Sequence, residues 1–216
     1  MLAHISLCAG IRWSGGSDGP VNTALVGVIV SHIAHYYSVL ALYSLSANIF
    51  GEETSTQKLI SFLSSALHII SPAGAFLSAP YGEPIFSLLN ISGYYLYTYS
   101  LIAEHKGAVL LRDLQLLAAA VLFAIATVVR SNGILSGFLF AYDAAILVWT
   151  VLTQGFSTHR VRRLAVLIVG GCVVALSMLV PQFLAYREYC VGGGNLRPWC
   201  SWTVPSIYNW VQSFYW

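Results

Sequence analysis

The fold class is decided by the stretch LAVLIVGGCVVALSMLVPQFLAY (residues 164–186), which contains no Asp, Glu, Lys or Arg between Arg163 and Arg187. A helix of about 20 apolar residues is long enough to cross the hydrocarbon core of a bilayer. Asp, Glu, Lys and Arg are also absent between Asp18 and Glu52, between Lys58 and Glu83, and between Glu83 and Glu104. The sequence therefore predicts an integral membrane protein built from helices.

The composition supports this prediction. Charged residues make up 8% of the chain and hydrophobic residues 57%, and the mean hydropathy is +0.73. In ordinary soluble domains about a quarter of the residues are charged. The 216 residues suffice for about six spans and their loops but not for a large soluble domain as well. The net charge of +2 gives no indication of a nucleic-acid partner.

The apolar runs predict an all-α polytopic membrane protein in which residues 1–216 form a single transmembrane domain with about six transmembrane helices. The expected spans lie near Val21–Phe50, Leu59–Ala79, Ile85–Ala103, Leu114–Val129, Ile134–Thr153 and Leu164–Leu184.

One basic cluster sets the expected orientation. His159, Arg160, Arg162 and Arg163 lie between the fifth and sixth expected spans, and basic loops remain on the cytosolic side of a membrane. Alternation then places the 71–84 turn, the 130–133 turn and the tail, residues 185–216, together on the opposite, luminal side.

Two cysteines fall in this luminal tail. Cys190 and Cys200 flank the flexible run Gly192–Gly194, so an oxidising lumen would allow them to close a short disulfide loop; the alternative is a pair of free thiols. Two cysteines without nearby paired histidines make only half a zinc site, so we expect no metal.

Polar residues at membrane depth have two interpretations. Asp143 in the fifth expected span can bind a lipid head group or carry protons, but we favour a hydrogen bond between helices that orders the bundle. His32 and His35 share a helix face, with His68 in the next span. We expect these histidines to serve packing rather than metal binding, since a metal site needs further ligands.

Three polar segments on the predicted luminal side are candidates for chemistry. Residues 71–84 contain three prolines and two glycines, including Tyr81 and Glu83 near the end. No regular helix can run through them, so the segment is expected to line a cavity or, alternatively, to form an interfacial loop. The second segment is Arg130-Ser-Asn132-Gly, and the third is Arg197-Pro-Trp199-Cys200, followed by a belt of aromatic residues.

These segments, together with Pro205, Tyr208, Gln212 and Tyr215-Trp216, resemble in order and spacing the GPI mannosyltransferase 2 (PIG-V) family, and most closely its fungal branch. The resemblance implies a GT-C type fold in the endoplasmic reticulum membrane with a luminal active face. It implies transfer of the second mannose, in α-1,6 linkage, from dolichyl phosphate mannose to the GPI precursor. The expected partners are these two lipids, the surrounding membrane lipids and a small membrane subunit; neither a cofactor nor a nucleic acid is expected.

The chain also departs from the family pattern. Family members carry, in a long luminal loop, an acidic residue beside a Trp that is regarded as the base. The region around Trp13 and Asp18 gives no credible match to it, so no catalytic residue is assigned. We therefore expect the chain to be the middle part of a longer enzyme.

The resemblance suggests roles for six residues. Arg130 or Arg197 would stabilise the departing phosphate through two parallel hydrogen bonds, or would anchor lipid head groups instead. Asn132 and Glu83 would hydrogen-bond sugar hydroxyls, or would cap their turns. The remaining two, Tyr81 and Trp199, are candidates for stacking on sugar rings.

Two other function classes remain open at this point. A transporter or flippase would suit broken helices and an acidic residue at membrane depth. A noncatalytic subunit of a membrane complex would suit the missing acidic loop.

Overall fold

The computed structural model describes residues 20–71, 74–191, 197–203 and 205–215, and throughout this part of the chain the regular structure is helical, without strands. The predicted all-α fold is confirmed for these residues. The helices are α2 (Pro20–Phe50), α3 (Ser55–Ile69), α4 (Gly74–Ser78), α5 (Glu83–His105), α6 (Val109–Val129), the 3₁₀ helix η2 (Ser131–Ser136), α7 (Gly137–Gln154), α8 (Thr158–Cys190), the 3₁₀ helix η3 (Pro198–Ser201) and α9 (Ile207–Tyr215).

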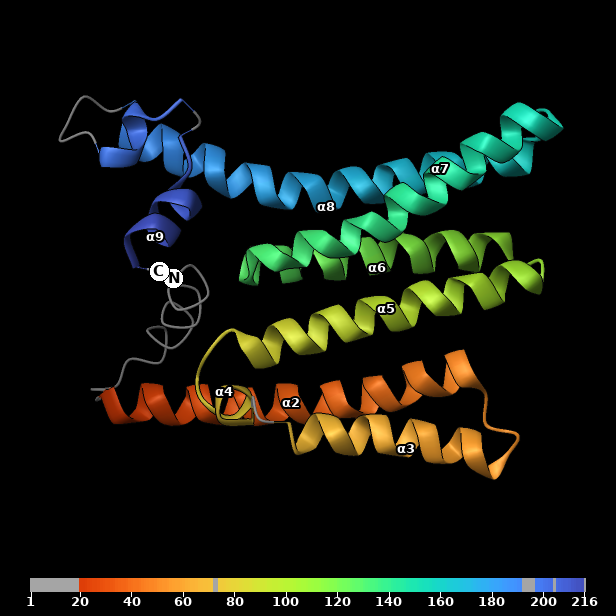
Figure 1. The fold of residues 1–216 in the computed structure, drawn as a ribbon, viewed down its shortest axis with the longest axis horizontal. Helices are drawn as coiled ribbons and strands as arrows, with labels where there is room; N and C mark the ends of the chain where they lie inside the picture. The colour runs from red at the N-terminus through yellow and green to blue at the C-terminus, as the bar shows by residue number, and fades with distance from the viewer. Residues whose placement is uncertain (1–19, 72–73, 192–196, 204, 216) are drawn as a thin grey trace.

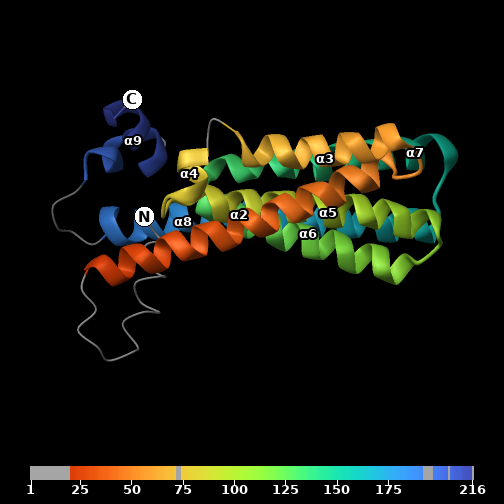
Figure 2. The same ribbon diagram turned by 90° about the horizontal axis from the view of Figure 1, so that it is seen from below.

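The long helices run up and down along one direction, so their connections gather at two ends of the bundle (Figures 1 and 2). We call one the turn end; it holds residues 79–82, 130–136 and 197–203 with α9. The other is the arginine end, with residues 51–54, 106–108 and 155–157. The three candidate segments therefore share one end, as alternation predicted, and α2 and α8 extend beyond their neighbours there (Figure 1).

Four helices in the described part of the chain are long and apolar enough to cross a membrane: Ala24–Phe50, Val109–Val129, Ser131–Gln154 and Thr158–Cys190. This is the membrane fold that the apolar runs predicted. The expected spans Leu59–Ala79 and Ile85–Ala103 are not among the four. The helix α3 has only 15 residues and ends at Ile69, ahead of the proline-rich turn. The helix α5 has 23 residues, but tyrosines and other polar side chains dilute its apolar character.

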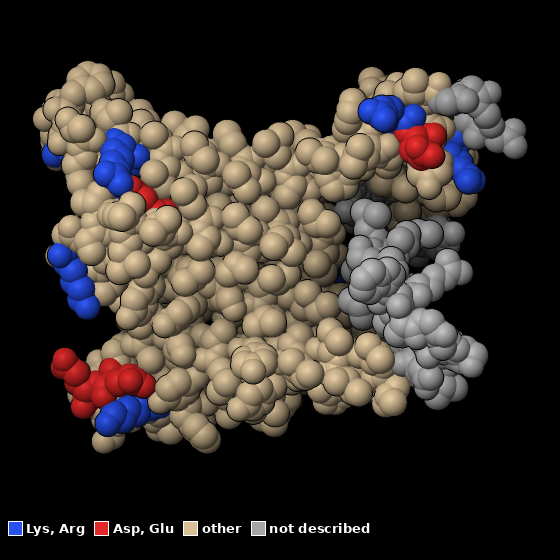
Figure 3. All heavy atoms as spheres, turned by 180° about the vertical axis from the view of Figure 1, so that it is seen from behind, with Lys and Arg blue, Asp and Glu red and all other residues tan. Residues whose placement is uncertain are grey.

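Charges are distributed as a bilayer requires. On the face shown in Figure 3, Lys, Arg, Asp and Glu gather at the two ends, and a broad band between them carries none. Large apolar side chains point outward within the membrane helices, for example Leu152 at 73% and Phe138 at 70% exposure. In a membrane such side chains meet lipid tails rather than water.

The core of the bundle depends on small residues that admit aromatic rings. A Cβ atom added to Gly93 of α5 would lie 2.6 Å from Cε1 of Phe123, and one added to Gly170 of α8 would lie 2.6 Å from Cε1 of Phe140. The two phenylalanines are fully buried and contact each other edge to face. Close approach of this kind is the usual way helices associate in membranes.

The arginine end is closed by tight turns. α2 ends at Phe50, and the next residue, Gly51, has a φ of 83°, which is open to glycine and strained for other residues. Thr54 and Gln57 then form a reciprocal capping box that starts α3. The turn after α7 likewise uses Gly155 at φ 84°.

Candidate functional site

The centre of the candidate site is an ion pair between two residues that are far apart in the sequence. Nη1 of Arg130 donates to Oε1 of Glu83 at 2.5 Å, and the Arg130 guanidinium lies over the ring of Phe86, 5.9 Å from its centroid. The Arg130 and Glu83 side chains are 41% and 32% exposed. The pair is therefore held in place yet accessible from the turn end.

Local structure explains why these two side chains meet. Glu83 is the first residue of α5 and is followed by Pro84 in the first turn, where a carboxylate interacts favourably with the helix dipole. Arg130 is extended, with φ −142° and ψ 129°, between α6 and η2. The end of α6 and the start of α5 thus present opposite charges to each other.

The turn after Arg130 requires a glycine. A Cβ atom on Gly133 would lie 2.5 Å from the backbone nitrogen of Thr127 and 2.7 Å from its Cα. The amide of Gly133 donates to the carbonyl of Arg130 at 2.9 Å. The sequence Arg-Ser-Asn-Gly is thereby folded back onto α6, which fixes the backbone that carries Arg130.

A polar contact that the sequence did not predict supports this turn from α5. The hydroxyl of Ser136 donates to Oδ1 of Asn90 at 2.7 Å and lies 3.4 Å from the Tyr94 hydroxyl. Ser136 is 2% exposed. The amide of Asn90 inside an apolar run was the available signal, because a buried amide needs a partner.

Two further predicted site residues lie at the surface of the same end. Asn132 is exposed, and its side chain makes no hydrogen bond within the described residues. Tyr81 is 57% exposed, with its ring 6.1 Å from that of Phe76. Both side chains are thus available for a ligand, and neither contacts the ion pair.

The tail is fastened to the end of α8. The disulfide between Cys190 and Cys200 joins Cα atoms 5.5 Å apart. Trp199 is 3% exposed, and its ring packs against Tyr189. Arg197 lies 5.8 Å from the centroid of the same tyrosine ring. In this arrangement Trp199 is a packing residue of the tail, and Arg197 contacts Tyr189 rather than the Glu83–Arg130 pair.

Several residues considered in the sequence lie outside the described part of the chain. These are Trp13 and Asp18 near the N-terminus, the glycine run 192–194, and the side chains of Tyr208, Gln212, Tyr215 and Trp216.

The polar groups at membrane depth tie helices together. Asp143 on α7 accepts a hydrogen bond of 2.5 Å from the Tyr97 hydroxyl on α5, as the helix-to-helix interpretation expected. Nε2 of His68 lies 3.1 Å from the Ser38 hydroxyl and 3.3 Å from that of Ser87. No group of three or more potential metal ligands is found among the described residues.

The arginine end contains a network of ion pairs, centred on a buried arginine, that the sequence did not reveal. The Arg112 side chain is 1% exposed, donates to Asp113 at 2.6 and 2.8 Å, and lies 3.5 Å from Glu104. Arg162 and Arg163 of α8 bind the same two carboxylates at 2.7 Å. The basic cluster predicted to mark the cytosolic side thus also joins α5, α6 and α8.

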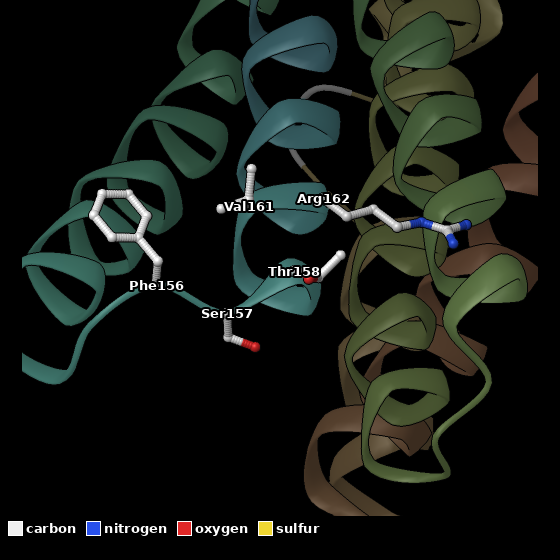
Figure 4. Close-up of a pocket in the computed structure, with 5 residues that line it drawn as sticks. All are labelled: Phe156, Ser157, Thr158, Val161 and Arg162. Atoms are coloured by element: carbon white, nitrogen blue, oxygen red, sulfur yellow. The ribbon is translucent and has the colours of Figure 1, made fainter.

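Two of the cavities lined by described residues lie away from the ion pair. One, of 460 Å³, sits at the turn between α7 and α8, where Phe156 projects outward while Arg162 reaches across to α6 (Figure 4). Another, of 600 Å³, is an apolar groove between α7 and α8 with Leu135, Phe138 and Gly171 in its wall. Neither combines an acid with a base, so neither competes with the turn end as a site for group transfer.

The chain matches a family described as Mannosyltransferase (PIG-V), over residues 20–216. It is 58% identical over 192 residues to the GPI mannosyltransferase 2 of Aspergillus oryzae, an alignment that covers 89% of this chain and 44% of that protein. With the GPI mannosyltransferase 2 of Chaetomium globosum it shares 39% identity, over 98% of this chain and 49% of that relative.

A more distant relative is the human GPI alpha-1,6-mannosyltransferase 2, 30% identical over 72% of this chain and 34% of its own length. The chain thus spans less than half the length of these curated relatives. No solved structure matches it significantly. Taken together, a family match over almost the whole chain and relatives of this similarity mean that the chain belongs to the mannosyltransferase (PIG-V) family.

Proposed function

We propose that this chain acts in GPI-anchor biosynthesis, in the transfer of the second mannose in α-1,6 linkage from dolichyl phosphate mannose to the GPI precursor. Its family membership and the names of its relatives support this reaction. The observation that carries the proposal is the accessible Glu83–Arg130 pair at the end of the bundle where the candidate segments meet. A guanidinium held in this way is suited to a phosphate oxyanion.

In the proposed reaction, a hydroxyl oxygen of the acceptor attacks the anomeric carbon of mannose. The bond from that carbon to the phosphate oxygen breaks, and dolichyl phosphate departs with the electron pair. One displacement inverts the anomeric carbon, so a β-linked donor gives an α-linked product. The hydroxyl proton passes to a base that is not assigned among the described residues.

Arg130 would stabilise the negative charge that develops on the departing phosphate. Before the donor arrives, Glu83 neutralises and orients the guanidinium. When the donor binds, its phosphate takes the place of the Glu83 carboxylate beside Arg130. Glu83 is then free to accept a hydrogen bond from a sugar hydroxyl. Asn132 and Tyr81 lie two residues from Arg130 and Glu83 in the sequence and are exposed, and they would contact the sugar. Arg197 would contact a second phosphate or a head group.

The finer architecture is part of the same proposal. We place the protein in the endoplasmic reticulum membrane with the turn end in the lumen, with six membrane helices in a GT-C type arrangement once α3 and α5 are included. A small membrane subunit is a further expected partner. The reaction needs no cofactor, because the sugar–phosphate bond of the donor supplies the leaving group.

The test is mannose transfer in microsomes that contain this chain and lack other second mannosyltransferase activity. With labelled dolichyl phosphate mannose and the one-mannose precursor, we expect label in the two-mannose product. If a full-length fungal relative forms this product in parallel while the chain, present in equal amount in the membrane, does not, the chain is a noncatalytic component and the proposal is wrong.

A further inference from the structure

A second charged cavity lies at the arginine end, opposite the candidate transfer site. Its volume is about 290 Å³, near the lower limit of small-ligand pockets. It opens between the end of α5, the middle and second half of α7 and the first two turns of α8. The residues that matter in its wall are Glu104, Asp143, Thr150, His159, Arg160 and Arg163.

The wall contains two carboxylates and two guanidinium groups, and one pair of them is already satisfied. Nη1 of Arg163 lies 2.8 Å from Oε1 and 2.7 Å from Oε2 of Glu104. This close, charge-assisted contact leaves little to offer a ligand at Glu104.

Of the other two charges, Arg160 has no carboxylate partner and Asp143 has only a long ion pair. Arg160 donates to the carbonyl of Gly155 at 3.0 Å and to the side-chain oxygen of Gln154 at 2.8 Å; both partners are neutral. Asp143 uses only Oδ2, which binds Tyr97 and lies 3.5 Å from Nη2 of Arg163.

This pattern selects the charge type of a ligand. A simple anion would meet two carboxylates in the wall, and a simple cation would meet two arginines, so each would be opposed by half of the charges. A group with a negative and a positive end can satisfy both. Its negative end would accept from the N–H groups of Arg160, and its positive end would donate to the second carboxylate oxygen, Oδ1, of Asp143.

The position of the cavity indicates that this group belongs to a lipid. Ile146, Leu147 and Thr150 complete the wall, and they lie in the membrane-crossing segment Ser131–Gln154. Pockets with basic side chains between membrane helices are known to bind lipid head groups. A ligand here would have its polar part among the charges and its tails beside α7.

We propose that this cavity binds the head group of a zwitterionic phospholipid that carries a primary ammonium, with its phosphate on Arg160 and its ammonium on Asp143. The requirement for N–H donors at the positive end distinguishes a phosphoethanolamine head group from a phosphocholine one. The proposal does not depend on the transfer reaction, because it concerns the other end of the molecule.

Native mass spectrometry of the purified chain tests the proposal. The chain would be extracted in mild detergent and offered phosphatidylethanolamine, phosphatidylcholine and phosphatidylglycerol with identical acyl chains at equal concentration. We expect one ethanolamine lipid to be retained about tenfold more strongly than either of the others. Equal retention of all three, or a preference for the anionic lipid, would overturn the proposal.

Two variants locate the site. Arg160→Gln removes the free positive charge, and the contacts of Arg160 lie within its own turn. Thr150→Trp fills the cavity. Each should lower retention of the ethanolamine lipid about tenfold, whereas Lys106→Gln, an exposed cation at the same end, should not.

Unchanged retention in both variants would show that the lipid binds elsewhere. Soluble O-phosphoethanolamine serves as the last arm. If it binds as tightly as the lipid, the ligand is a soluble compound and the assignment to a lipid is wrong.

Discussion

At the residue scale, the central feature is a guanidinium that binds an internal carboxylate and, in the proposed reaction, exchanges it for the donor phosphate. Such a pair is worth little to stability when it is a third or more exposed, because water and salt screen it. Its value lies in orientation. Glu83 and Phe86 hold Arg130 from one side, and a fixed guanidinium presents two parallel donors, which an ammonium cannot do.

The first prediction concerns Arg130. Arg130→Ala should lower the rate of second-mannose transfer in microsomes about 10²- to 10³-fold, the usual loss when one donor to a developing oxyanion is removed. Arg130→Lys should recover only part of the rate, since it restores the charge without the paired donors. The matched control is Arg187→Ala, another arginine near the turn end that is exposed. Full activity of Arg130→Ala at normal protein level would remove Arg130 from the mechanism.

The second prediction concerns Glu83. Glu83→Gln keeps the size of the side chain but no longer holds the guanidinium by charge, so transfer should slow about tenfold through loss of orientation. The one-mannose precursor should then accumulate, which thin-layer chromatography of labelled lipids would detect. If the precursor does not accumulate, the carboxylate is dispensable. Thermal stability should change little in this variant, because the pair is exposed.

At the element scale, the connections rather than the helices determine where the chemistry lies. The turn between α6 and α7 is held by Gly133 against Thr127 and by Ser136 on Asn90 of α5. The other end is held by Arg112, whose buried charge has carboxylates from two segments around it. Each connection therefore fixes a neighbouring helix as well as its own.

The turn itself gives the third prediction. Gly133→Ala would place a Cβ atom 2.5 Å from a backbone nitrogen, so the turn has to shift, at a cost of about 1–3 kcal/mol. We expect a lower melting temperature in detergent together with reduced transfer, because Arg130 moves with the turn. Gly74→Ala is the control, since no atom lies within 4 Å of its added Cβ. An equal effect of the two substitutions would contradict the argument.

The arginine end gives the fourth prediction. Arg112→Ala leaves Asp113, whose side chain is 8% exposed, short of a buried partner. Breaking a buried ion pair on one side destabilises by about 3–5 kcal/mol. Thermal unfolding of the solubilised protein should show a clear decrease in melting temperature, while Lys106→Ala, which changes an exposed cation at the same end, should not. An unchanged melting temperature would mean that Asp113 is satisfied by Arg162 alone.

At the scale of the whole molecule, the bundle has two chemically different ends, and on the face shown in Figure 3 a band without charged residues separates them. The proposed donor and acceptor are both lipids, so their sugars can reach only the end that faces their leaflet. The assignment of the turn end to the lumen is therefore the condition on which the proposed reaction depends.

Sidedness is the fifth prediction. In sealed microsomes, Ser201→Cys in the tail should be protected from a membrane-impermeant maleimide, while Glu53→Cys between α2 and α3 should be labelled; both positions are exposed. Permeabilisation should make the first accessible. Labelling of the tail cysteine in intact vesicles would place the turn end in the cytosol and contradict the proposed reaction.

Much of this arrangement follows from local sequence. Apolar runs predict the long helices, and prolines and glycines predict the turns, because both depend on neighbouring residues. The shortness of α3 could have been read from the proline-rich segment after it. Three features could not be predicted from local sequence, because each joins residues whose distance depends on how helices pack. They are the pairing of Glu83 with Arg130, the burial of Arg112 and the contact of Ser136 with Asn90.

The helix α8 has 33 residues, which corresponds to about 50 Å at 1.5 Å per residue. The hydrocarbon core is only about 30 Å thick. Even with a bend at Pro181, the last turns of α8 therefore extend beyond the fatty acyl region. The disulfide attaches the tail to this protruding end of α8. At that height the tail can contact only the hydrated part of a proposed lipid-linked substrate. Substitutions in the tail should therefore change which sugar is accepted, and should not change how the lipid part of the substrate partitions into the membrane.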